Sequence, residues 1–168
     1  LTYPYLVRTS YFKFLLDVFV FVAKKALYVC FINYGGMRTF RINGTNLTPK
    51  IDFNGTTGEM SLTGKSIFFE KDHFWDGLFI WYMGYLRNPK EKTVLNIDLE
   101  YFNTQTSSRL MCLLKMTRFL QKKGLALEIN WACYDEDEDQ LELIELFENV
   151  TKLTISIQHK VTTQKFVA

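Results

Sequence analysis

Strand patterns and helix patterns alternate along most of this chain, and their order is the feature that most restricts its fold. The predicted strands are 50–53, 59–62, 94–102, 125–133 and 152–158, and the predicted helices are 70–86, 105–123 and 137–149. Strands separated by helices are typical of a parallel sheet with helices packed on it, whereas the short link between the first two strands predicts an antiparallel hairpin. The sequence therefore predicts one α/β domain with a mixed, mostly parallel sheet in the order β-β-α-β-α-β-α-β.

Two consecutive segments carry the clearest patterns. In residues 94–102 apolar side chains alternate with polar ones, which predicts a strand with one buried and one wetter face. In residues 105–123 apolar side chains recur at helical spacing, and the pattern ends in two lysines followed by Gly124. Basic residues in a last turn and a glycine after it are typical of a helix C-terminus. Residues 101–104 therefore form a strand-to-helix turn.

The composition is that of a folded protein of one domain. The chain has 168 residues, of which 48% are apolar and 23% charged, and this is enough for a single sizeable core. Its net charge of +2 is unevenly placed, because residues 1–43 contain six basic side chains and one acidic one. The remaining residues are slightly acidic, with 14 basic and 17 acidic side chains. Nucleic-acid binding draws on clustered lysine and arginine, so the composition predicts no nucleic-acid partner.

The chain lacks the familiar signatures of catalysis, metal binding and nucleotide binding. It has no CxxC pair, no GxGxxG loop and no GxxxxGK[ST] loop, and its two histidines are far apart in the sequence. Of its three cysteines, Cys112 and Cys133 have apolar neighbours, which predicts buried, reduced thiols of a cytoplasmic protein. We therefore predict a protein that is not an enzyme and holds no cofactor and no metal. A hydrolase that uses Asp135 or Asp137 is an alternative, and it would need a deep polar pocket.

Residues 1–36 differ in character from the rest of the chain. They are apolar and aromatic, but their longest uninterrupted apolar run, residues 18–23, is far shorter than the roughly 20 residues that a membrane-spanning helix needs. Stable membrane insertion is therefore not expected, and no cleavage site of a signal peptide follows. We predict that translation starts at Met37, with residues 1–36 an extension and residues 37–168 the domain. A membrane-surface tether and an extra packed helix are the alternatives.

The helix that follows residues 101–104 is rich in hydroxyl groups in its first turn. The hydroxyl-bearing residues there are Thr104, Thr106, Ser107 and Ser108. Either Asn103 or Thr104 is expected to cap the helix by accepting a hydrogen bond from a free backbone N–H group. A helix N-terminus also accommodates a phosphate group, because its free N–H groups and the helix dipole favour negative charge. A hydroxyl at this place is both a candidate cap and a candidate phosphoacceptor.

A set of short motifs runs along the chain. In order they are Leu47-Thr48-Pro49-Lys50-Ile51, Gly58-Glu59-Met60-Ser61-Leu62-Thr63-Gly64-Lys65-Ser66, Leu99-Glu100-Tyr101-Phe102-Asn103-Thr104, Ile129-Asn130-Trp131, Tyr134 and the acidic run 135–139. Together they resemble the SiaC family of bacterial regulatory phosphoproteins. The likeness spans residues 42–158, and the Tyr-Phe-Asn-Thr segment followed by hydroxyl residues is its most specific part. The chain departs from the usual family pattern at residues 67–70 and at Gln105, where the family commonly has serine.

The resemblance implies a fold like that of anti-sigma-factor antagonists, the STAS or SpoIIAA-like fold. It also implies that Thr104 is the phosphoacceptor, and that a dedicated kinase and a phosphatase act on it. The unphosphorylated form would bind an effector protein, in some systems a diguanylate cyclase. The turn and cap around the acceptor would consist of Tyr101, Asn103, Thr106, Ser107 and Ser108.

Two further segments are candidates for partner binding. The helix 70–86 has two apolar stripes, and a helix packed on one face of a sheet buries only one of them. The second stripe would be covered by residues 1–36 or by a second copy of the chain, or it would bind a partner. The acidic run 135–139 ordinarily places negative charge at the start of the next helix, and a docking patch is its alternative role. The predicted partner contacts are Glu70, Trp75, Phe79, Tyr82, Asp135 and Asp137.

Two functions of different classes follow from these observations. The first is a cytoplasmic, non-enzymatic switch in which phosphorylation of Thr104 controls binding to a protein effector. The second is a constitutive protein-binding or dimerising α/β module in which Thr104 only caps a helix. They differ in whether negative charge at residue 104 changes partner binding.

Overall fold

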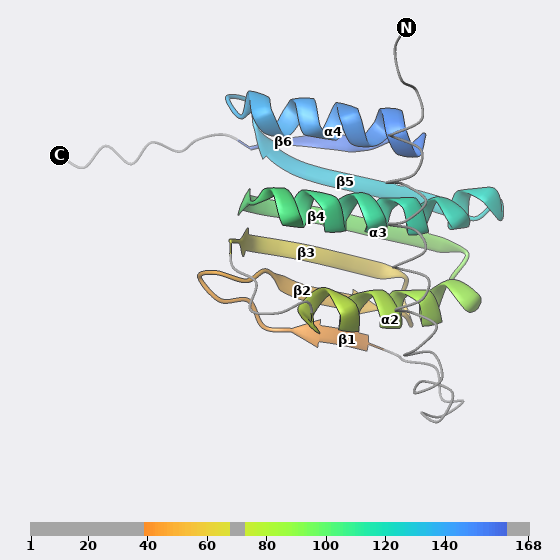
Figure 1. Ribbon diagram of the computed structural model, residues 1–168. Coiled ribbons are helices and arrows are strands. Elements are labelled where there is room, and N and C mark those ends of the chain that lie inside the picture. Colours follow the sequence, from red (N-terminus) through yellow and green to blue (C-terminus); the bar gives the residue numbers. More distant parts are fainter. Residues whose placement is uncertain (1–38, 68–72, 161–168) are drawn as a thin grey trace, which may run out of the picture. The chain divides into compact units, whose positions relative to one another are not determined.

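The computed structural model describes residues 39–67 and 73–160, all of which belong to the unit Met37–Ala168. Six strands form one sheet whose spatial order follows the chain order (Figure 1). The strands are β1 (Thr39–Ile42), β2 (Lys50–Asn54), β3 (Glu59–Ser66), β4 (Lys92–Phe102), β5 (Ala126–Tyr134) and β6 (Ser156–Lys160). The helices are α2 (His73–Arg87), α3 (Thr104–Lys122) and α4 (Glu138–Thr151). Within the described ranges no helix is both long and apolar enough to cross a membrane.

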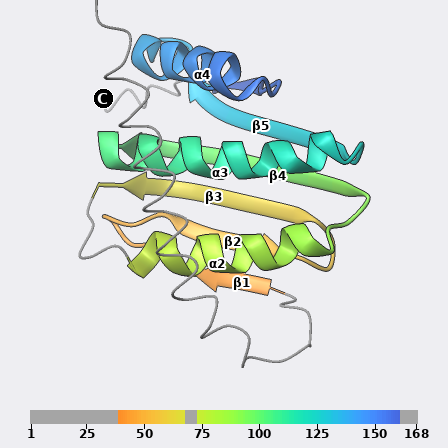
Figure 2. The same cartoon turned by 45° about the vertical axis from the view of Figure 1, so that its right-hand side comes forward.

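Parallel pairing decides where functional residues can meet. β1, β2 and β3 pair antiparallel, whereas β3, β4, β5 and β6 pair parallel with their neighbours. Each parallel neighbour is reached through a helix, and α2, α3 and α4 all lie on the same face of the sheet (Figures 1 and 2). The last residues of β3 to β6 therefore share one edge of the sheet with the N-termini of α3 and α4. We call this the carboxyl edge; its strand ends are Ser66, Phe102, Tyr134 and Lys160.

The predicted class of fold is confirmed, but the predicted order lacked one strand. β1 was missed because it has only four residues, too few for its alternation of exposed and partly buried side chains to stand out. β3 also continues beyond its predicted end to Ser66, past Gly64, whose φ is +96° and where the register with β4 shifts. Glycine tolerates this conformation because it has no Cβ. The predictions for Glu70, for Met37 and for residues 1–36 fall outside the described residues.

The side of the sheet that faces the helices forms the core. Along β4 the buried residues are Thr93, Leu95, Ile97 and Leu99, so the predicted alternation is confirmed as far as Leu99. Tyr101, which was predicted on the same face, is exposed instead. On the other face polar side chains pair with each other: Asn130 Nδ2 donates to Asn96 Oδ1 at 3.0 Å, and Lys92 Nζ lies 2.8 Å from Glu128 Oε2. The hydrogen bond from Lys92 lowers the pKa of the Glu128 carboxyl. One face is thus packed and apolar, and the other is polar.

The aromatic side chains of α2 belong to the core, which corrects two of the predicted partner contacts. Trp75 and Tyr82 are only 1% and 0% exposed, and Phe79 is partly buried. Both stripes are covered because α2 packs on the sheet and also against α3, where Tyr82 Oη lies 2.8 Å from Thr117 Oγ1. Burial raises the pKa of the Tyr82 hydroxyl. Trp75 and Tyr82 therefore stabilise the fold and offer no surface to a partner.

The substitution Tyr82→Phe tests the buried link between α2 and α3. We expect the free energy of unfolding to fall by about 1 kcal/mol, because the aromatic ring is kept while one buried hydrogen bond is lost. The loss is limited because Thr117 Oγ1 also donates to Leu113 O at 2.8 Å. Chemical denaturation of the variant and of Tyr134→Phe, which alters an exposed tyrosine, gives the comparison. Equal stability of both variants would contradict a stabilising role for this hydrogen bond.

Candidate functional site

Asn103 holds together the turn between β4 and α3. It is the N-cap of α3, with extended backbone, and its Oδ1 accepts a hydrogen bond from Thr106 N at 2.9 Å. Its Nδ2 donates to Ile67 O at 3.1 Å, and its backbone N donates to Ser66 O at 3.3 Å. One side chain and one amide thus join the end of β3 to the start of α3. The sequence did not decide whether Asn103 or Thr104 caps the helix, and the structure assigns the cap to Asn103.

Thr104 is the first residue of α3, and its side chain is exposed. The other three hydroxyl groups of this turn are engaged. Thr106 is buried, with its Oγ1 at 2.9 Å from Ser66 Oγ, while Ser107 Oγ donates to Asn103 O at 3.2 Å and Ser108 Oγ donates to Thr104 O at 3.2 Å. Among the described residues, no hydrogen-bond partner is found for the Thr104 hydroxyl. The role of a cap, which the sequence offered to Thr104, is therefore wrong, since Asn103 fills it.

The electrostatic surroundings of Thr104 are compatible with an added negative group. The first turn of α3 contains no acidic residue, and the helix dipole places partial positive charge there. The acidic side chain of Glu100, on the neighbouring strand, is paired with Lys65, whose Nζ lies 3.6 Å from Glu100 Oε2. A phosphate on Thr104 would therefore be favoured by the free N–H groups and dipole of the helix without a carboxylate in the same turn to oppose it.

The acidic run lies at the same carboxyl edge, after β5. Asp137 is the N-cap of α4: its Oδ1 accepts from Gln140 N at 3.1 Å and its Oδ2 accepts from Gln140 Nε2 at 2.9 Å. Gln140 Oε1 in turn accepts from the buried Trp131 Nε1 at 2.7 Å. Asp135 is exposed and paired with His159. The ordinary role predicted for the run, negative charge at a helix start, is what the structure shows, with Glu138 and Asp139 in the first turn of α4.

The two thiols within the described residues are both free. Cys133 is buried, and its pKa is raised by burial and by the nearby Asp137 and Asp135 carboxylates. Cys112 is only partly buried, unlike its prediction, because it lies on a side of α3 that the sheet does not cover. Burial nevertheless raises the pKa of the Cys112 thiol. Neither thiol has the lowered pKa of a reactive cysteine.

The carboxyl edge brings together some of the predicted site residues and leaves others apart. Tyr101, which is 56% exposed, and Thr104 lie there, together with the acidic run. Sequence reasoning placed Ser66 in a family motif but assigned it no contact, and its buried hydroxyl lies 2.9 Å from Thr106 Oγ1; the predicted strand ended at residue 62, four residues before Ser66. In the described part of the chain, no group of three His, Cys, Asp or Glu side chains could hold a metal ion.

The fold and this edge together define a small α/β domain with an exposed threonine at a helix N-terminus. A sequence model of a known family, the SiaC family regulatory phosphoproteins, matches residues 42–160. The chain belongs to this family. A comparison with curated protein sequences found no match.

Solved structures of this family share the fold. The crystal structure of apo-SiaC from Pseudomonas aeruginosa is 23% identical, with a TM-score of 0.63, and the match covers 73% of this chain and 99% of that chain. A second structure contains SiaC of the same organism in complex with the diguanylate cyclase SiaD, of which SiaC is called the activator. That match has 24% identity and a TM-score of 0.65, and it covers 72% of this chain and 99% of the other.

Two alanine substitutions separate the cap from the exposed threonine. Asn103→Ala should lower the free energy of unfolding by about 1–2 kcal/mol, because a helix cap and the link to β3 are lost together. Thr104→Ala should change it by less than about 0.5 kcal/mol, because an exposed side chain is removed. Denaturant unfolding of both variants checks this. A larger loss for Thr104→Ala than for Asn103→Ala would contradict the assignment of the cap.

Proposed function

We propose that the protein is a non-enzymatic switch in which Thr104 is phosphorylated by a partner kinase and dephosphorylated by a partner phosphatase. The observation that carries this proposal is the difference among the four hydroxyl groups of the turn. Three of them are engaged in hydrogen bonds, whereas the Thr104 hydroxyl is exposed at the first position of α3. A kinase can therefore reach and modify Thr104 without breaking a contact that stabilises the fold.

Phosphorylation would change the surface more than the fold. A phosphate adds nearly two negative charges at neutral pH and three strong hydrogen-bond acceptors. At the start of α3 these charges are tolerated by the helix dipole, so the domain should stay folded. A partner that docks on the carboxyl edge would, however, meet a new anion near Glu100 and Asp135. This supports a switch that acts by electrostatic repulsion and desolvation at an interface.

We propose that the unphosphorylated form binds an effector such as a diguanylate cyclase through the carboxyl edge. Two exposed tyrosines, Tyr101 on β4 and Tyr134 at the end of β5, lie there, and Lys160 Nζ is 5.4 Å from the centre of the Tyr134 ring. Exposed aromatic groups with charged neighbours are typical of protein interfaces. The complex of SiaC with SiaD supports this class of effector for a family member. The proposal places the protein in the cytoplasm, where its free thiols stay reduced.

Phosphorylation of Thr104 is tested with the cognate kinase and intact-mass measurement. Wild-type protein should gain one phosphate, Thr104→Ala should gain none, and the matched variant Ser108→Ala, which removes another exposed hydroxyl of the same turn, should be modified like the wild type. The phosphatase should return the mass of the wild-type protein to its starting value. Full modification of Thr104→Ala would show that the acceptor lies elsewhere.

Effector binding is tested by titrating the effector with unmodified and phosphorylated protein. We expect the dissociation constant to rise at least roughly tenfold on phosphorylation. Binding would then have to remove water from the phosphate and place it against the surface of the effector. Thr104→Glu should weaken binding in the same direction, and Thr104→Gln, which has nearly the same shape without the charge, should not. Equal affinity of all forms would favour the constitutive binding module instead.

A further inference from the structure

The two neighbouring helices α3 and α4 carry opposite charge. Helix α3 has no acidic residue, and its basic residues are Arg109, Lys115, Arg118 and Lys122. Helix α4 has no basic residue, and its acidic residues are Glu138, Asp139, Glu142, Glu145 and Glu148. The helix dipole explains acidic residues in the first turn and basic residues in the last turn. It does not explain Lys115 in the middle of α3 or Glu145 in the second half of α4.

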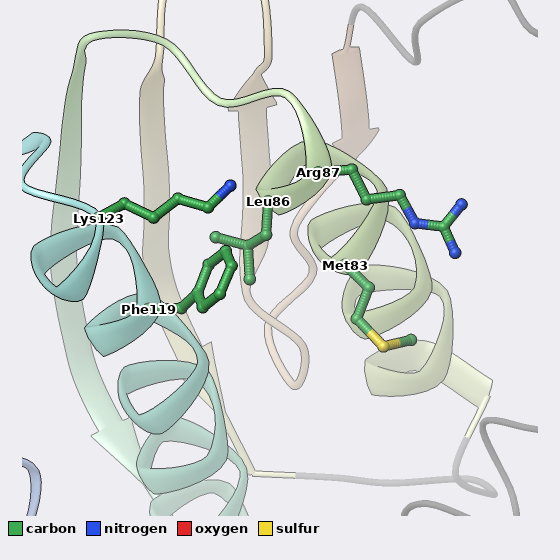
Figure 3. Close-up of a pocket in the computed structure, with 5 residues that line it drawn as sticks. All are labelled: Met83, Leu86, Arg87, Phe119 and Lys123. Atoms are coloured by element: carbon green, nitrogen blue, oxygen red, sulfur yellow. The ribbon is translucent and has the colours of Figure 1, made fainter.

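A shallow apolar depression lies between the C-terminal halves of α2 and α3 (Figure 3). It has a volume of about 290 Å³ and is lined by Met83, Leu86, Arg87, Phe119 and Lys123. Phe119 is 44% exposed, which is unusual for so large an apolar group, and Lys123 Nζ lies 4.6 Å from the centre of its ring. Figure 3 shows Phe119 of α3 and Lys123, the C-cap residue of α3, pointing towards Leu86 of α2. The surface combines an apolar floor with positive charge, and none of the described residues that line it is acidic.

The complement of this depression is present on the same chain. The second half of α4 exposes two large apolar side chains, Leu146 at 51% and Val150 at 39%. Glu142 and Glu145 are exposed next to them on the same helix. Apolar groups flanked by acidic groups are the chemistry that an apolar, basic groove would bind.

We propose that two copies of the chain associate with α4 of each copy seated in the α2–α3 groove of the other. Helices α2, α3 and α4 lie in this order on one face of the sheet, and each runs antiparallel to the strands it connects (Figures 1 and 2). A twofold axis parallel to the helices generates the second copy. In that copy the order of α2, α3 and α4 across the interface is reversed, while the helices keep the same direction. The second half of α4 then lies over the second halves of α2 and α3, and the contact is made twice.

This interface lies away from the proposed switch. Phe119 and Thr104 are both on α3 but fifteen residues apart, which is about 22 Å along the helix axis at 1.5 Å per residue. Thr104 stays accessible to a kinase in the dimer. Self-association therefore goes beyond the proposed switch, and Thr104→Ala should dimerise like the wild type.

Sedimentation equilibrium of the full chain tests the proposal, with two charge-reversed variants. Arg87→Glu/Lys123→Glu reverses the groove, and Glu142→Lys/Glu145→Lys reverses α4. The wild type should dimerise, and raising the salt from about 0.05 M to about 0.5 M NaCl should weaken the dimer, since exposed charges are screened. Each variant alone should have a dimer dissociation constant at least roughly tenfold higher, because groove and α4 then repel each other. Mixed in equal amounts, the two variants should restore a dimer, because both contacts become attractive again.

A matched control variant and the mixing result distinguish a lost interface from a misfolded variant. Lys50→Glu/Lys90→Glu makes the same change in net charge as the groove variant, at exposed positions outside α3 and α4, and it should dimerise like the wild type. Circular dichroism and thermal unfolding verify that every variant is folded. A wild type that stays monomeric at about 0.3 mM would overturn the proposal. A wild-type dimer that the mixed variants fail to restore would also overturn it, because the dimer would then form through another face.

Discussion

The structure around Thr104 depends on the amide side chain of Asn103. This single group accepts the hydrogen bond that starts α3 and donates one to the carbonyl of Ile67 beyond β3. Because it uses both ends of the amide, neither alanine nor aspartate could do the same. The side chain of Thr104 takes no part in the cap, and it is exposed at the start of the helix. Because Asn103 holds the turn and Thr104 does not, a phosphate can be added to Thr104 without unfolding the domain.

The sequence predicted the larger part of the fold. The alternation in β4 and the helical spacing in α3 are strong because each element has one face on the core and one on solvent. The turn between them was located for the same reason. β1 was missed because its four residues are too few for a pattern, and the continuation of β3 was missed because the predicted strand ended at residue 62, before Gly64. A short strand is stabilised by its pairing with a neighbouring strand, and this pairing leaves no periodic pattern in the strand's own sequence.

The site was harder to predict than the fold, because it depends on contacts between distant segments. Asn103 and Thr104 are both N-cap residue types, and the sequence alone left the cap open between them. In the structure Asn103 accepts the capping hydrogen bond and also contacts Ile67, which is distant in the sequence. Trp75 and Tyr82 looked like a free stripe because a helix on a sheet buries one side, whereas α2 is also covered by α3 through Thr117. The acidic run was read correctly, since a carboxylate before a helix acts locally.

The polar face of the sheet has a consequence for how this family can diverge. Its polar side chains are satisfied mainly by one another, as in the pairs of Arg41 with Asp52 and of Lys92 with Glu128. Exposed pairs of this kind contribute little free energy each, so one pair can be exchanged for another without loss of the fold. The helix-facing positions, by contrast, must keep their volume. Two homologues can therefore differ at most positions of one face and still superpose, as this chain does with SiaC at 23% identity.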